Sequence, residues 1–167
     1  MTRGHGTDLV VFSLAGHEYG FPLEDVAEIV LMVAVLPVPD SPPWLLGIAD
    51  VRTQTVPVVD LRARLGIPAA AIDVTTPMII VRREGRLMGF VVDAAHDVRR
   101  LPAGAVEPPD EVHSGGVLSG IARVDGKTIA VLDAAPLFDA GAALDVPLER
   151  FIPRREDGRE SEIESRA

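Results

Sequence analysis

An internal repeat constrains the fold of this chain more than any other feature of its sequence. The segment 47–60 recurs as the segment 120–133, and seven positions are identical between the two. A weaker echo relates segment 16–21 to segment 85–90, and both echoes keep the same order along the chain. A duplicated strand pattern can close into small barrels that leave few unpaired edges. We therefore predict two related β subdomains of about five strands each.

Short runs rich in valine, isoleucine and leucine are separated by glycine, proline and aspartate, a pattern typical of many short strands. Asp125-Gly126 is a strong hairpin signal, and Gly16 and Gly85 suit similar turns. We expect about ten strands, near residues 9–14, 18–22, 26–33, 47–52, 55–59, 78–83, 87–92, 97–101, 118–124 and 128–132. Helical turns are expected only after Asp60 and Asp133, whose side chains can cap the amides that follow. The sequence therefore predicts the all-β class with short helical turns.

The chain divides into one folded region and the terminal segments on either side of it. The folded region is expected over 9–140, with a proline-rich connecting loop at 36–43. Residues 1–8 are expected to lack order, and 141–152 are expected to form a C-terminal extension. The tail 153–167 has nine charged residues in fifteen positions, which predicts disorder.

Composition excludes several classes of function. A formal net charge of −9 opposes contact with nucleic acid or an anionic membrane, and one Trp, one Tyr and five Phe offer few platforms for base stacking. The apolar runs are far shorter than the roughly 18 residues of a membrane span. The N-terminus has no secretory signal, so we expect a cytoplasmic protein. The absence of cysteine rules out disulfides and thiolate sites.

No constellation of residues points to catalysis. Asp60 and Asp133 could form an acid–base pair if the two repeats faced each other, but their positions at strand ends suit helix capping better. The histidines share no metal-ligand spacing and stand at positions 5, 17, 96 and 113. Segment 113–116 lacks the pattern of a nucleophile elbow. We therefore predict no enzyme activity, cofactor or metal, and favour protein binding through strand faces, edges or a groove between the barrels.

Six motifs follow one another in a characteristic order. They lie at 9–14, 18–29, 39–47, 56–62, 89–93 and 118–122. In this order, from Leu9 to Phe138, they resemble the CheW-like family, the coupling proteins of bacterial chemosensory arrays. The resemblance implies two five-stranded, SH3-like barrels, in agreement with the repeat.

The resemblance also implies a mechanism and partners. Members of this family have no catalytic activity, and they bridge the cytoplasmic tip of a chemoreceptor and the regulatory domain of a CheA-type histidine kinase. Such an adaptor holds the kinase near the receptor, so that a receptor change alters the kinase's conformational equilibrium. We accordingly expect a cytoplasmic adaptor that is recruited to membrane-associated receptor arrays.

The resemblance further indicates binding residues. Arg52 falls on the arginine of the family's usual Asn-Leu-Arg-Gly motif, and Val26, Glu28 and Ile29 fall on a segment implicated in partner contact. The guanidinium of Arg52 suits a carboxylate or carbonyl of the receptor tip, and the alternative is an exposed strand-end arginine with no partner. For Val26 and Ile29 the alternative is core packing, because side chains alternate between the two faces of a strand.

One position departs from the family motif. Thr53 replaces the motif glycine, and Asp50-Val51 replaces Asn-Leu. If that glycine takes a positive φ, Thr53 cannot do so cheaply, and the turn must differ. We expect a shift in partner specificity, which leaves open a dedicated receptor or a chemosensory pathway unrelated to swimming.

Two further hypotheses remain open. The chain could be a regulatory module equivalent to the kinase's own CheW-like domain, although no phosphotransfer histidine segment, nucleotide site or receiver pattern accompanies it. It could also be a small hydrolase that uses Asp60 and Asp133.

Overall fold

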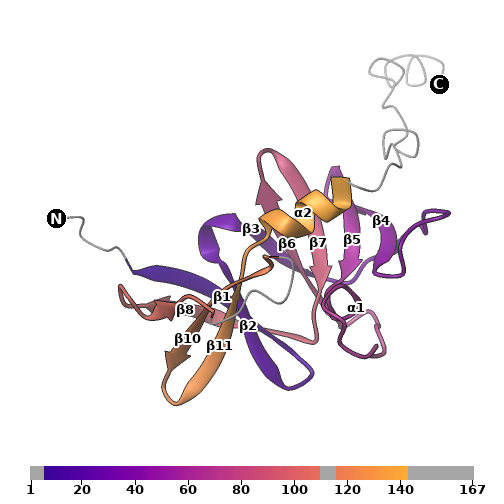
Figure 1. Ribbon diagram of the computed structural model, residues 1–167. Coiled ribbons are helices and arrows are strands. Elements are labelled where there is room, and N and C mark those ends of the chain that lie inside the picture. Colours follow the sequence, from indigo (N-terminus) through magenta and orange to yellow (C-terminus); the bar gives the residue numbers. More distant parts are fainter. Residues whose placement is uncertain (1–5, 110–115, 143–167) are drawn as a thin grey trace, which may run out of the picture.

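The structure, a computed structural model, describes residues 6–109 and 116–142. Its strands are β1 (Thr7–Leu14), β2 (His17–Pro22), β3 (Val26–Leu31), β4 (Leu45–Val51), β5 (Gln54–Asp60), β6 (Pro77–Arg83), β7 (Arg86–Val91), β8 (Ala94–Leu101), β9 (Val106–Glu107), β10 (Leu118–Val124) and β11 (Lys127–Leu132). They form a six-stranded sheet of order β8-β1-β2-β11-β10-β9 and a five-stranded sheet of order β3-β6-β7-β5-β4 (Figure 1).

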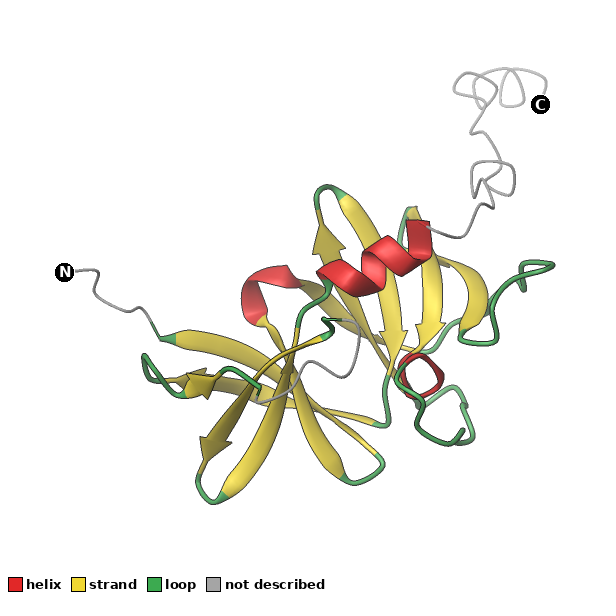
Figure 2. Ribbon diagram, viewed as in Figure 1, coloured by secondary structure: helices red, strands yellow, loops and turns green. Residues whose placement is uncertain are grey.

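Helices are few and short (Figure 2). They are the 3-10 turn η1 (Leu23–Asp25), α1 (Leu61–Arg64) and α2 (Ala135–Ala142). An Asp60 carboxylate oxygen accepts a hydrogen bond from the amide of Arg62 at 3.1 Å, and one of Asp133 accepts from the amide of Ala135 at 2.9 Å. The predicted capping role of both aspartates is confirmed, as is the all-β class. Within the described residues, no helix has the length and apolarity needed to cross a bilayer.

The observed strands match the predicted ones with small shifts at their ends. β1 begins at Thr7, so Thr7 and Asp8 belong to the sheet and not to the unordered segment expected over 1–8. β8 begins at Ala94 rather than Asp97, and the short strand β9 is absent from the sequence-based prediction. The tail 153–167 and nearly all of the predicted extension 141–152 lie outside the described residues.

Each sheet draws strands from both halves of the repeat. In the six-stranded sheet, β1 pairs with β8, and β2 pairs in parallel with β11. In the five-stranded sheet, β3 pairs with β6, and β5 pairs in parallel with β7. The two predicted subdomains are therefore present as two sheets, but the two halves of the sequence are interleaved between them, and one sheet has six strands rather than five.

The repeated hairpins, β4–β5 and β10–β11, share one irregularity. The pairing register shifts beside Gly47 in the first hairpin and beside Gly120 in the second. At Gly47 an added Cβ would collide with the backbone of Leu36, and at Gly120 it would collide with the side chain of Val106. Both glycines thus allow a crossing segment to approach at the same place in each repeat.

The largest apolar cluster joins the two sheets. It includes Phe12 and Phe21 of the six-stranded sheet, Phe90 of the five-stranded sheet and Phe138 of α2. The centroids of successive rings in this series lie 5.2, 5.4 and 6.5 Å apart. Each sheet also has a smaller apolar cluster of its own. The two sheets therefore share one core, to which α2 adds Leu137 and Phe138.

Candidate functional site

Arg52 and Glu28 meet at one end of the five-stranded sheet. Arg52 Nε donates a hydrogen bond to Glu28 Oε2 at 2.8 Å. Arg52 lies in the turn between β4 and β5, and Glu28 lies in β3, which forms the opposite edge of the sheet from β4. The side chain of Arg52 is 75% exposed and that of Glu28 is 27% exposed. The terminal nitrogens of the guanidinium therefore stay accessible while Glu28 fixes its direction.

The backbone of the β4–β5 turn differs from that of a turn with glycine at its second position. Arg52 has a φ of 58°, in the left-handed region, whereas Thr53 has no positive φ. Thr53 thus avoids the conformation that is open to glycine, as expected from its β-branched side chain. Arg52, the candidate for partner binding, is therefore the one residue of this turn in the left-handed region.

The Arg52–Glu28 pair borders a cavity of about 270 Å³. Every strand of the five-stranded sheet contributes to its lining. Four of its apolar lining residues belong to the smaller core cluster of this sheet or pack against it, namely Val51, Val56, Ile80 and Leu87. Its charged lining residues are Glu28, Arg52 and Arg82. The cavity is thus an open end of the core of one sheet, and Arg52 and Glu28 meet there rather than between the two sheets.

The apolar candidates on β3 face opposite ways. Val26 is half-buried and packs against the shared core, as the core-packing alternative states. Ile29 is 43% exposed, and Leu31, two residues further on the same face, is 57% exposed. Of the two candidates, Ile29 is therefore the one that offers apolar surface to a partner.

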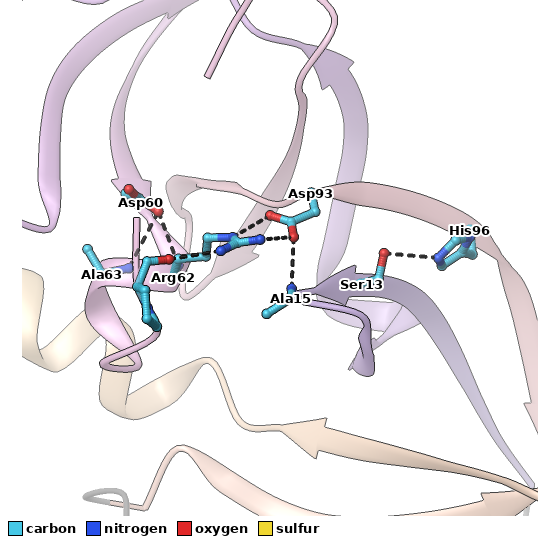
Figure 3. A network of polar contacts seen from close by, with 8 residues as sticks. Ser13, Ala15, Asp60, Arg62, Ala63, Asp93 and His96 are labelled. Atoms are coloured by element: carbon cyan, nitrogen blue, oxygen red, sulfur yellow. Dashed lines mark hydrogen bonds and ion pairs between the residues drawn. The ribbon is translucent and has the colours of Figure 1, made fainter. Parts of the chain in front are cut away.

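A second polar network, which the sequence analysis did not single out, connects the two sheets (Figure 3). Arg62 Nε donates to one carboxylate oxygen of Asp93 at 2.7 Å, and a terminal nitrogen of Arg62 donates to the other. The second oxygen also accepts a hydrogen bond from the amide of Ala15, at 2.8 Å. Arg62 further donates to the carbonyl oxygen of Pro68 at 2.8 Å. The network thus ties α1 and the end of β7 to the β1–β2 turn.

The charges of this network stabilise each other. The hydrogen bonds from Arg62 hold the pKa of Asp93 below its ordinary value, and the amide of Ala15 acts in the same direction. The hydrogen bond to Asp93 in turn raises the pKa of Arg62. A paired, charged carboxylate at neutral pH is a poor proton donor or acceptor, so this arrangement indicates a structural role. Arg62 ends the motif 56–62 and Asp93 ends the motif 89–93, but nothing within either motif indicates that the two residues pair.

The residues weighed for chemistry do not converge on one site. Asp60 and Asp133 cap α1 and α2, at the ends of strands in different sheets. His96 Nε2 lies 3.2 Å from the hydroxyl oxygen of Ser13. Within 6–109 and 116–142, no group of three or more histidine and acidic side chains could hold a metal ion. His5 and His113 lie outside the described residues.

Comparison with known proteins shows which family this chain is similar to. The sequence model of the CheW-like domain matches residues 8–142. The chain is 28% identical to the chemotaxis protein CheW of Rhizobium meliloti, over 83% of this chain and 90% of that protein. It is also 28% identical to the chemotaxis protein CheW of Bacillus subtilis, over 80% of this chain and 88% of that protein. The crystal structure of the scaffolding protein TtCheW from Thermoanaerobacter tengcongensis matches with a TM-score of 0.72 and 35% identity, over 77% of this chain and 89% of that one.

Proposed function

Because this chain belongs to the CheW-like family, we propose that it is a non-enzymatic chemotaxis adaptor that couples a CheA-type histidine kinase to the cytoplasmic tip of a chemoreceptor. The observation that carries the proposal is the family match over residues 8–142. It is supported by the relatives named as CheW and by the similar structure described as a scaffolding protein. The alternative of a regulatory module is less supported, because the match covers most of the length of these relatives.

The adaptor acts by position rather than by chemistry. Bound to both partners, it raises the effective concentration of the kinase at the receptor. A receptor change then shifts the kinase between conformations, to the extent that the adaptor contacts differ between them. The protein works in the cytoplasm and is recruited to receptor arrays at the membrane.

The receptor-binding site consists of Arg52, Glu28 and Ile29. Glu28 directs the guanidinium of Arg52 through the 2.8 Å hydrogen bond, and the exposed terminal nitrogens of Arg52 receive an oxygen of the receptor tip. Ile29 adds apolar surface on the outer face of β3. Val26, at the start of β3, packs against the shared core and supports the site from that side.

A binding experiment with both partners tests this function. The chain is mixed with the regulatory domain of a CheA-type kinase and with the cytoplasmic fragment of a chemoreceptor, both encoded in the same genome. We expect pull-down and calorimetry to detect both complexes, and Arg52→Ala to weaken the receptor complex about tenfold while the kinase complex persists. Binding of the folded chain to neither partner would reject the adaptor function. Equal weakening of both complexes would show that Arg52 is a structural residue.

A further inference from the structure

A second arginine lines the cavity beside the Arg52–Glu28 pair. Arg82 lies on β6, between β3 and β7 in the five-stranded sheet. It stands two residues after Ile80, which is 1% exposed and belongs to the core cluster of this sheet. Because alternate residues of a strand share a face, Arg82 follows the inward row of β6, and it is exposed at the open end of that core.

The charge of Arg82 is uncompensated in the described part of the chain. Arg52 is paired with Glu28, whereas Arg82 has no acidic side chain within ion-pairing distance among residues 6–109 and 116–142. The three charged lining residues therefore leave one net positive charge at the cavity, on a protein whose formal net charge is −9. A guanidinium beside an apolar floor is stabilised when a carboxylate arrives.

We propose that Arg82 determines partner specificity at this site by receiving a carboxylate of the receptor tip. This inference rests on the proposed function. The cavity of about 270 Å³ accepts one apolar side chain of the receptor, and the floor of Val56, Ile80 and Leu87 packs against it. The matching receptor segment thus carries an aliphatic or aromatic residue next to an aspartate or glutamate. Arg82 pairs with that carboxylate while Arg52, already directed by Glu28, holds a second oxygen.

The test compares two charge reversals on opposite sheets. Arg82→Glu changes the cavity, and Arg123→Glu is the control, because Arg123 is an exposed arginine on β10 of the six-stranded sheet. Calorimetry measures their binding to the cytoplasmic receptor fragment at low and high salt. We expect Arg82→Glu to lower the affinity at least about tenfold at low salt and Arg123→Glu to change it less than about twofold. Raising the salt concentration should reduce the difference in receptor affinity between Arg82→Glu and the wild type, because salt screens the charges.

A milder variant and a compensating change keep the test decisive. Arg82→Gln, which removes the charge and retains polarity, is expected to lose about three- to fivefold in affinity even if Arg82→Glu folds poorly. A lysine in place of one tip carboxylate of the receptor fragment should restore binding to Arg82→Glu. If Arg82→Glu and Arg82→Gln bind as the wild type does while Arg52→Ala does not, the inference is overturned and the adaptor function stands. If the wild type binds neither receptor nor kinase, the adaptor function itself fails.

Discussion

At the scale of single residues, the turn that presents Arg52 stands apart from the other hairpin turns. Three hairpins place glycine at the second turn position, with positive φ at both positions: Ala15-Gly16, Glu84-Gly85 and Asp125-Gly126. In the β4–β5 turn, Arg52 alone has a positive φ, of 58°. A residue with a Cβ is disfavoured there by about 1 kcal/mol, so the side chain proposed to bind the receptor is attached to a strained backbone position.

This strain predicts a difference between two variants that both remove the Arg52 side chain. Arg52→Gly should have a free energy of unfolding about 1 kcal/mol higher than Arg52→Ala, because glycine adopts the left-handed conformation without steric cost. Urea denaturation followed by circular dichroism measures both values. Equal stabilities would mean that residue 52 does not hold this conformation in solution.

At the scale of elements, the β4–β5 hairpin depends on a crossing segment. The amide and carbonyl groups of Leu36 and Ile48 form two hydrogen bonds, of 2.8 and 2.9 Å, and these connect the chain after β3 to β4. Gly47, with a φ of 147°, lies directly beneath this crossing. This link holds the two edge strands of the five-stranded sheet, and therefore Glu28 and Arg52, in fixed positions relative to each other.

Gly47→Ala is expected to break this arrangement. The new Cβ collides with the backbone of Leu36, which cannot move aside as a flexible side chain would, so we expect the free energy of unfolding to fall by about 2 kcal/mol or more. Hydrogen exchange should show loss of protection at the amides of Leu36 and Ile48. Gly16→Ala is the matched control: it also has a positive φ but open space around it, and it should cost only about 1 kcal/mol. Equal effects of the two substitutions would contradict the crossing contact.

At the scale of the whole molecule, the two sheets are joined by a shared core and by the Arg62–Asp93 network. Asp93 follows β7 of the five-stranded sheet, and its carboxylate binds the turn between β1 and β2 of the six-stranded sheet. Its own amide donates to the carbonyl oxygen of Ser13 at 3.1 Å. The network therefore fixes how one sheet, which carries the Arg52 site, lies against the other.

Asp93→Asn is expected to weaken this connection in a pH-dependent way. The pKa of Asp93 is lowered in the folded state, so its contribution is present above the unfolded value near 3.8 and is lost as the pH falls through the folded value. At pH 7 the variant should lose roughly 1 kcal/mol in the free energy of unfolding, a modest figure because solvent screens the pair. Denaturant unfolding from pH 7 to pH 3 should show the difference shrinking in acid. A constant difference at every pH would show that the charge of Asp93 does not act through the network.

Much of the local structure could be predicted from the sequence. The Asp125-Gly126 turn, the capping by Asp60 and Asp133, and the strand positions follow from residue types a few positions apart. Arg52 and Glu28 were candidates through the family motif, but their hydrogen bond joins residues on the two edge strands of a sheet. Arg82 and Asp93 gave no local signal, because the role of each depends on which strand lies beside it.

Residue types and their spacing are enough to predict a duplicated set of short strands with capped helical turns. How those strands are shared between the sheets is visible only in the folded molecule, where β1 and β2 are joined to strands of the second half and β6 and β7 to strands of the first. The physical reason lies in the repeat. Because the two halves are similar, each strand has similar possible partners in its own half and in the other half. The spacing of residues along the sequence therefore does not show which of the two partners a strand pairs with. Burial of the aromatic core, to which both sheets contribute, favours the interleaved pairing.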